Sequence, residues 1–424
     1  MKSYGSTGIE KKKFDWLAIG LYVGIVLFGW LNIYAAIYDE SHAAIFDFSC
    51  QHGKQIIWIG VAWILAFMIL LIEPKVFSQT AYPIYIVILG TLVLTLFIGQ
   101  VVNGGKGWIN FGVFKFQPAE FAKFATALAV AKYMSAIDLD LSKTKSWLKA
   151  LGILAVPAAL ILLEDDTGSA LVFTGFVFAL FREGMSPWVL ILGLAAIVLF
   201  VMALLINKYI LIGIIALITV GYIFLWLNKR NRQTYIQAFA FIAICVAFIC
   251  SVDFAFNKVL EPHQRERIEV LLGKTEDLAG AGDNVNQSKI AIGSGGFFGK
   301  GFLNGTITKA DFVPEQETDF IFCTVGEERG FFGSTLLLTA YVVLLVHLIT
   351  MAERQRSTFS RFYGYSVAGI LFMHVLINVG MVLGLLPVIG IPLPFFSYGG
   401  SSLLAFTILL FIFIRQDADR NQLI

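Results

Sequence analysis

Charged residues are scarce in this chain. Lys, Arg, Asp and Glu make up 14% of its 424 residues, whereas a soluble domain carries about 25%. This scarcity argues against a soluble domain, and a net charge of +2 gives no indication of nucleic-acid binding. Apolar residues instead make up 58% of the chain, in repeated runs near the length of roughly 20 residues that spans a bilayer. The composition predicts an integral membrane protein.

Cysteine and histidine are also few. The four cysteines form no CxxC pair, so no metal or redox framework is predicted. None of the five histidines stands in a motif that pairs it as a base with the serines of FFSYGGSS at 395–402, so a nucleophilic serine is not expected. No tandem repeat, low-complexity tract or signal-peptide cleavage site is visible, and the first apolar run is interpreted as a retained span.

Apolar segments recur along the chain, and each is a candidate helix. We therefore predict an all-α integral membrane protein with about twelve transmembrane helices, organised as a single polytopic membrane domain over 1–424. The segments are 16–38, 56–72, 81–98, 118–134, 147–163, 169–185, 188–206, 210–227, 235–250, 331–351, 365–386 and 402–414.

Lys and Arg in the connecting segments set the expected orientation. With the N-terminus in the cytoplasm, eighteen of these residues fall in inside segments and four in short outside loops. Because cytoplasmic loops carry the excess of Lys and Arg, both termini are predicted to be cytoplasmic. Residues 252–330 then form one large extracytoplasmic loop.

This loop contains the most polar stretch of the chain, 284–333, which is rich in glycine and acids. Long loops are usually functional or disordered, and its glycines and aromatics argue against disorder. We therefore place the candidate active site in 252–330. The GSGGFFGKG segment departs from the Walker A pattern, so ATP use is not predicted.

Other candidate residues lie outside this loop. Trp108 follows several glycines, which allow a ligand to approach closely, but an interfacial aromatic is the simpler explanation. Glu120 and Lys123 share one face of the fourth predicted helix, where a structural ion pair and a functional pair are equally well supported. Ser397 offers a hydroxyl at the head of the last predicted helix.

Three adjacent acids, Glu164, Asp165 and Asp166, open a short turn. They could bind a divalent cation such as Mg or Mn through oxygen ligands. Asp166 could equally cap the following helix, and capping is the favoured interpretation. No cofactor is certain, and the need for a metal stays open.

Seven ordered blocks give the chain a specific resemblance to the SEDS family, the group that contains RodA and FtsW, and more to its RodA branch. The resemblance covers most of the chain and implies a ten-helix core plus an extra helical pair around 207–250. The blocks are GWINFGVFKFQPAEFAK at 107–123, DDTGSAL at 165–171, HQRERIEVLL at 263–272, QSKIAIGSGGFFGKG at 287–301, FVPEQETDFIF at 312–322, GEERGFFG at 326–333 and PVIGIPLPFFSYGGSS at 387–402.

The resemblance implies an inverting peptidoglycan glycosyltransferase of the bacterial cytoplasmic (inner) membrane. Such proteins polymerise lipid II, a disaccharide-pentapeptide on undecaprenyl pyrophosphate. The implied partners are a class B penicillin-binding protein transpeptidase, other membrane proteins of the elongation complex, and membrane lipid. The family's essential acid falls on Asp319, and a Glu found in some members falls on Asp311.

The chain departs from the family pattern at several positions. Gly107 stands where the family usually has Arg before the loop Trp, and Glu317 replaces the His of PExHTD. The LLDP segment is replaced by Leu-Leu-Gly-Lys at 271–274, and the family's QPDLG becomes Glu-Asp-Asp-Thr-Gly at 164–168. These changes bear on acceptor binding more than on the reaction itself.

The chemistry of glycan polymerisation assigns expected roles. A base must take a proton from the attacking hydroxyl, and cations or backbone N–H groups must stabilise the departing pyrophosphate. Asp319 adjoins an apolar FIF run, which should raise its basicity, although it could instead cap the helix that follows. Asp311 and Glu315 are the next acids to consider in this segment. Candidates for pyrophosphate contact are Arg265, Arg267, Lys289 and Lys300. The arginines of 260–272 could instead be ordinary headgroup contacts of an interfacial helix.

Two other functions compete with the polymerase. Charges within a span, such as Glu120 and Lys123, would suit a lipid II flippase or another transporter. A non-catalytic scaffold for cell-wall enzymes is the second alternative. The acidic extracytoplasmic loop favours the enzyme, because transport sites tend to lie near the bilayer midplane.

Overall fold

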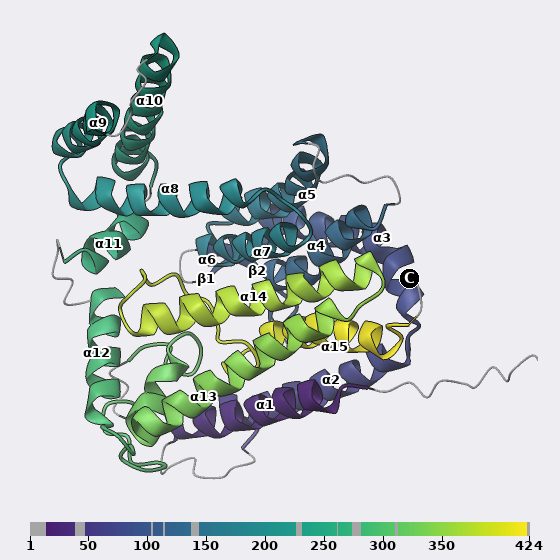
Figure 1. Cartoon of the computed structure of the whole chain (residues 1–424). Helices are drawn as coiled ribbons and strands as arrows, with labels where there is room; N and C mark the ends of the chain where they lie inside the picture. Colours follow the sequence, from purple (N-terminus) through teal and green to yellow (C-terminus); the bar gives the residue numbers. More distant parts are fainter. Residues whose placement is uncertain are drawn as a thin grey trace, which may run out of the picture. The chain divides into compact units, whose positions relative to one another are not determined.

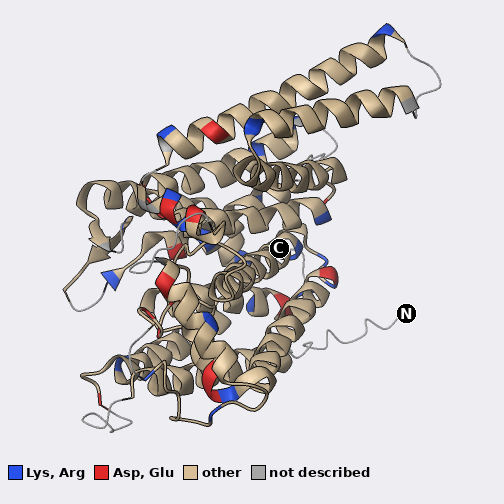
Figure 2. Ribbon diagram, turned by 90° about the vertical axis from the view of Figure 1, so that its left-hand side faces the viewer, with Lys and Arg blue, Asp and Glu red and all other residues tan. Residues whose placement is uncertain are grey.

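In the computed structural model, long helices dominate the chain. The structure describes residues 14–38, 47–102, 105–112, 115–136, 144–225, 231–260, 262–273, 281–309 and 313–421. Among these residues, nine helices are long and apolar enough to cross a membrane, and two shorter apolar helices accompany them. Long stretches of these helices carry no charged residue (Figure 2). The prediction of an all-α membrane protein with about twelve helices is confirmed.

Every predicted apolar segment coincides with helical structure. The helices are α1 (Trp16–Ala36), α2 (Gln51–Leu71), α3 (Pro74–Ile98), α4 (Pro118–Met134), α5 (Thr144–Leu163), α6 (Thr167–Val172), the 3-10 turn η2 (Phe173–Gly175), α7 (Phe176–Arg182), α8 (Pro187–Leu205), α9 (Lys208–Leu225), α10 (Arg232–Phe254), α13 (Ile321–Glu353), α14 (Thr358–Val382) and α15 (Gly400–Ala418). The sixth predicted helix is thus made of three consecutive pieces.

The chain forms two compact units, one of Met1–Met185 with Asp283–Ile424 and one of Ser186–Gly282. In the smaller unit, α10 packs on α8 and α9, and continues into a π-helical turn, η3 (Ala255–Val259), before α11 (Pro262–Leu271). Its small core joins Leu204, Val252 and Phe256. The prediction of a single domain over 1–424 is not tested by this division and stays a prediction.

The core of the larger unit is built around α4, α14 and α15. Helix α14 packs against α13, α7 and α4, and α15 packs against α2 (Figure 1). Helix α4 is buried along almost its whole length, and its many alanines let neighbouring helices approach closely. Polar groups placed on these three helices therefore lie among protein atoms.

The predicted loop 252–330 contains more helix than its polarity suggested. Helix α12 (Ala281–Ser294) lies within it, and α13 begins at Ile321 instead of at the predicted 331. Gly330 explains the second difference, because its φ of 63° breaks the helical backbone inside α13. The long apolar run starts only after that break, so hydropathy marked the second half of the helix alone.

A small antiparallel sheet precedes α4. It has the order β1 (Gln100–Val102), β2 (Gly105–Asn110) and β3 (Lys115–Phe116). Gln100 pairs with Trp108, and Ile109 pairs with Phe116. The sheet carries Gly107 and Trp108 on β2, and β2 packs against both α3 and α4.

Candidate functional site

The turn 313–320 carries Asp319 and is fixed to three separate parts of the larger unit. The Gln316 side chain donates a hydrogen bond to the Ala36 carbonyl at the end of α1 (2.9 Å). The Tyr398 N–H donates to the Glu317 carbonyl (2.9 Å). The Asn378 amide of α14 donates to the Asp319 carbonyl (2.8 Å). Three independent anchors thus set the position of this acid.

Asp319 is half-buried and stands just before α13. The N-cap residue of α13 is Phe320, so the structure does not support helix capping by Asp319. Its carboxylate lies against the backbone of Gly390: a Cβ at that glycine would lie 3.1 Å from Oδ2. Gly390 also has a φ of 64°, a conformation that favours glycine. The bare backbone there lets the chain approach the acid closely.

The segment next to Asp319 is held by two side chains of α14. Asn378 donates a second hydrogen bond to the Ile391 carbonyl (2.8 Å), and His374 Nδ1 lies 3.2 Å from the Pro392 carbonyl. These two residues are four apart and share one face of the helix. They therefore fix 390–392 against the carboxylate of Asp319.

His374 also joins the site to the predicted pair on α4. Lys123 Nζ lies 2.6 Å from Glu120 Oε1 and 2.8 Å from His374 Nε2, over the ring of Phe406 at 4.9 Å. Lys123 and Glu120 are only 1% and 2% exposed. The ion pair expected from their spacing is present, and its role in function stays a prediction. Through His374 and Pro392 it connects to the segment beside Asp319.

The acids of the turn 164–166 have different roles. Asp166 caps α6, since its Oδ1 accepts a hydrogen bond from the Ser169 N–H (2.8 Å), which confirms capping for this residue. Its Oδ2 accepts from the Gln117 amide (3.1 Å). Asp165 has a φ of 61°. The adjoining Gly168 lies against the Ile389 carbonyl, so this turn borders the segment that contacts Asp319.

Glu164 does not take part in capping. Its side chain is fully buried, and neither carboxyl oxygen has a hydrogen-bond partner among the described residues. Burial, followed by the negative charge of Asp166, raises the pKa of Glu164 to about 8. Sequence reasoning grouped this acid with its neighbours as a cap and missed its separate environment.

Lys300 fixes a loop through Glu327. Its Nζ lies 2.7 Å from Glu327 Oε1. The same fully buried carboxylate accepts hydrogen bonds from the N–H groups of Thr306, Ile307 and Thr308. The charge of Lys300 is therefore engaged within the protein, and its predicted contact with pyrophosphate stays a prediction.

Four further predicted residues have varied surroundings. Ser397 is buried and accepts a hydrogen bond from the Leu393 N–H (2.8 Å). Lys289 is exposed on α12, beside Gly384. Trp108 is half-buried in β2, and the exposed Glu315 accepts from the Thr318 hydroxyl (3.0 Å). Asp311 lies outside the described residues.

The two predicted arginines lie on α11 in the smaller unit. Arg265 is 43% exposed, with Nε 2.8 Å from Glu269 Oε1 and its guanidinium 5.2 Å from the Phe256 ring. Arg267 is half-buried. Their predicted role in binding stays a prediction.

Sequence reasoning also missed the positioning residues His374, Asn378 and Gln117. Two polar side chains four apart in the apolar run of α14 were an available signal, because polar groups in a span are often functional. Among the described residues, no group of three or more His, Cys, Asp or Glu could hold a metal ion. A cation bound by only one or two of these side chains would need water or other groups to complete its coordination.

Comparison with known proteins gives one family. The model of the FtsW, RodA and SpoVE family, described as "Cell cycle protein", matches residues 15–232 and 211–422. Peptidoglycan glycosyltransferase MrdB of Escherichia coli (strain K12) is 34% identical over 347 residues, which are 82% of this chain and 80% of that protein. Peptidoglycan glycosyltransferase RodA of Treponema pallidum (strain Nichols) is 30% identical over 92% of this chain and 94% of its own.

Solved structures share the fold. A chain from a peptidoglycan synthase complex, described in terms of coordinated polymerization and crosslinking, matches with a TM-score of 0.68 and 27% identity, covering 96% of this chain and 99% of that chain. The rod shape determining protein RodA of Thermus thermophilus matches with a TM-score of 0.62 and 25% identity, covering 98% and 100%.

Proposed function

The chain belongs to the FtsW, RodA and SpoVE family of cell cycle proteins and is a peptidoglycan glycosyltransferase; we propose that it polymerises lipid II during cell elongation, with Asp319 as the catalytic base. One observation carries the assignment of the base. The carboxylate of Asp319 is half-buried, and its turn is anchored to α1, α14 and the segment after α14. A general base needs this kind of fixed position.

The proposed reaction is an inverting displacement. The acceptor hydroxyl oxygen attacks the anomeric carbon of the donor, and Asp319 takes the proton of that hydroxyl. The new carbon–oxygen bond replaces the bond to undecaprenyl pyrophosphate, which leaves with the electron pair. Cations stabilise such a leaving group. In the larger unit, the exposed Lys289 is a candidate for this contact. The roles of Arg265 and Arg267 stay predictions.

The test is lipid II polymerisation by purified protein with its partner. Asp319→Asn is nearly isosteric, so it should preserve folding while removing the base, a loss of roughly 10²–10⁴-fold in rate. Asp319→Glu should also be slow, because a displacement near 1 Å can cost about a hundredfold. Glu73→Gln is the matched control, since Glu73 is exposed and makes no side-chain hydrogen bond as the N-cap residue of α3. Equal rates for wild type and Asp319→Asn would exclude Asp319 as the base.

We further propose that the chain works with a class B penicillin-binding protein, which crosslinks the glycan, and with other membrane proteins of the elongation complex. The support is its similarity to a chain of a synthase complex that both polymerises and crosslinks. Co-purification from membranes would test this, with the polymerisation rate measured with and without the transpeptidase. Equal rates, with no complex formed, would contradict the proposal.

A lipid II flippase is the second candidate, supported by the buried group of Lys123, Glu120 and His374 among membrane helices. The two functions predict different results in sealed liposomes. A flippase moves lipid II between leaflets without forming glycan, whereas a polymerase forms glycan from lipid II supplied on one side. Lys123→Met should stop movement if the pair serves transport.

We propose an orientation with both termini in the cytoplasm and 252–330 outside the bacterial cytoplasmic membrane. Labelling of intact spheroplasts with an impermeant thiol reagent tests it. Asp283→Cys should react and Arg356→Cys should not. Both should be made in a background with Cys50 and Cys250 replaced by Ser, because neither native thiol is buried. The reverse pattern would invert the topology.

A further inference from the structure

Three polar side-chain atoms converge on the backbone of Gly107 in strand β2. A Cβ placed on this glycine would lie 3.8 Å from Glu164 Oε2, 3.9 Å from Asp166 Oδ2 and 4.0 Å from Gln117 Nε2. These are ordinary contact distances, so the space beside the glycine accepts an atom without collision. The atoms come from the turn before α6 and from the residue before α4, two segments distant in sequence.

Two carboxyl groups meet at the convergence point. Glu164 is fully buried, and both of its carboxyl oxygens lack a hydrogen-bond partner among the described residues. A buried carboxylate needs a hydrogen bond, a proton or a cation. Lys106 contributes only its main-chain N–H, which donates to the Glu164 carbonyl (2.8 Å). Lys123 is already bound between Glu120 and His374.

Gly107 and Glu164 lie directly beside each other, because a Cβ at Gly107 would lie 3.8 Å from Glu164 Oε2. Since Gly107 has no side chain, strand β2 leaves the space next to this carboxyl group open.

We propose that Glu164 and Asp166 bind a divalent cation in the space beside Gly107. The class is a hard cation such as Mg²⁺ or Mn²⁺, because both protein groups are carboxylates. If the side-chain amide of Gln117 rotates by half a turn, it gives up its hydrogen bond to Asp166 Oδ2 and turns its oxygen toward the cation as a third ligand. Magnesium often takes one or two carboxylates and completes its shell with water and substrate phosphates.

The cation would also serve the proposed reaction. The turn 164–168 borders the segment 389–391, which contacts Asp319. A pyrophosphate held there would share the cation with the two carboxylates. This second step rests on the proposed function, whereas cation binding itself does not.

The probe is Mn²⁺ alone. Its binding to the purified full chain is measured as the loss of the electron paramagnetic resonance signal of free Mn²⁺. Wild type should bind one equivalent. Glu164→Gln, which is nearly isosteric, should bind at least ten times more weakly. Asp165→Asn is the matched control and should bind like wild type, because Asn tolerates a positive φ and Asp165 is not one of the converging groups. Size-exclusion profiles would confirm that each variant is folded.

Gly107→Arg tests the position of the cation. The guanidinium should occupy the space beside the two carboxylates, so Mn²⁺ binding should fall by at least tenfold. Mn²⁺ should raise the thermal midpoint of wild type and leave the midpoints of Gly107→Arg and Glu164→Gln unchanged. Undiminished binding in Gly107→Arg would place the cation elsewhere and overturn the assignment.

Two other results would refute the cation site. Wild type without saturable Mn²⁺ binding, or equal affinity in wild type and Glu164→Gln, would mean that Glu164 holds a proton instead. Because these measurements need no lipid II, failure of the polymerase proposal would leave their outcome intact. If binding is confirmed, the dependence of polymerisation on Mn²⁺ should be weaker in Gly107→Arg than in wild type.

Discussion

A fully buried acid lies near each end of α13, but the two acids accept hydrogen bonds from different kinds of partner. Near Ile321, Glu327 accepts hydrogen bonds from three successive backbone N–H groups of the loop 306–308. Near Glu353, Asp417 of α15 accepts hydrogen bonds from the side chains of Arg354 and Gln355. The first acid shapes a loop, and the second ties helices together.

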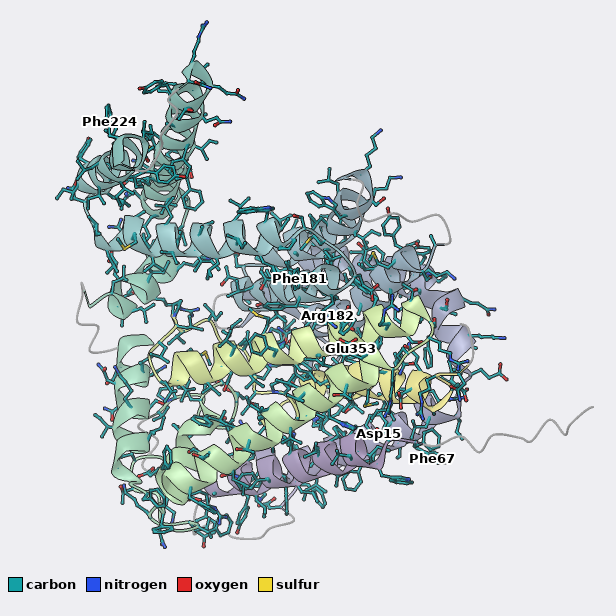
Figure 3. The ribbon with its side chains drawn as sticks, viewed as in Figure 1. Asp15, Phe67, Phe181, Arg182, Phe224 and Glu353 are labelled. Atoms are coloured by element: carbon teal, nitrogen blue, oxygen red, sulfur yellow. The ribbon has the colours of Figure 1, made fainter. Side chains whose placement is uncertain are left out.

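This difference predicts how each end of α13 responds to the loss of a single contact. At the Ile321 end, the carboxylate of Glu327 accepts from three successive N–H groups of a segment without regular structure, and the adjacent Glu328 adds one bond from the Leu303 N–H. Asp319 lies just outside the helix. At the Glu353 end, several side-chain contacts share the task. Arg354 bonds both Asp15 and Asp417, and Arg182 of α7 lies beside Glu353 (Figure 3). Loss of one contact there leaves others in place.

Glu327→Gln should produce the largest effect of the comparison. The variant loses the charge of a buried acceptor and its bond to Lys300, which should cost about 1.5–3 kcal/mol, the range for hydrogen bonds to charged groups. Limited proteolysis should cut the loop 300–308 faster than in wild type. Thr306→Val, which removes one hydroxyl and keeps the backbone N–H, should have a smaller effect. An unchanged cleavage rate would show that the acid does not shape the loop.

Asp417→Asn should have a smaller effect than Glu327→Gln. Arg354 keeps Asp15 as a partner and is 34% exposed, so water can replace part of what is lost. A cost of about 1.5 kcal/mol, the low end of the range for charged hydrogen bonds, is expected. The thermal midpoint in detergent measures it. A larger drop than for Glu327→Gln would reverse the order of the two ends.

Acidification should reveal the smallest effect, at Asp15. Burial alone would raise the pKa of Asp15, but hydrogen bonds from the Ala18 N–H, His347 and Arg354 outweigh it and lower the pKa. A lowered folded-state pKa means that Asp15 stabilises the protein above its unfolded value of about 3.9, and that this contribution is lost as pH falls through the folded value. Asp15→Asn keeps the N-cap of α1 and should therefore flatten the acid limb of a thermal-midpoint profile. An identical limb would exclude Asp15.

Local signals predicted much of the fold. The length of the apolar segments predicted the helices, because a membrane span needs about 20 apolar residues. The sequence block around Asp319 indicated the acid whose turn the structure anchors at three points. Other features depend on contacts between distant residues. The break at Gly330 arises because the helix meets the 296–299 turn, where a Cβ would lie 2.3 Å from the Gly299 nitrogen. The isolation of Glu164 likewise follows from packing that no local pattern records.

The three anchors of the turn 313–320 determine how Asp319 can move. The three hydrogen bonds attach the turn to the end of α1, to α14 and to the segment after α14, so a shift of any of these elements is transmitted to Asp319. The Asn378 bond is made to the main chain of Asp319 itself, whereas the other two are made at Gln316 and Glu317. Of the three anchors, Asn378 therefore acts most directly on the position of the acid.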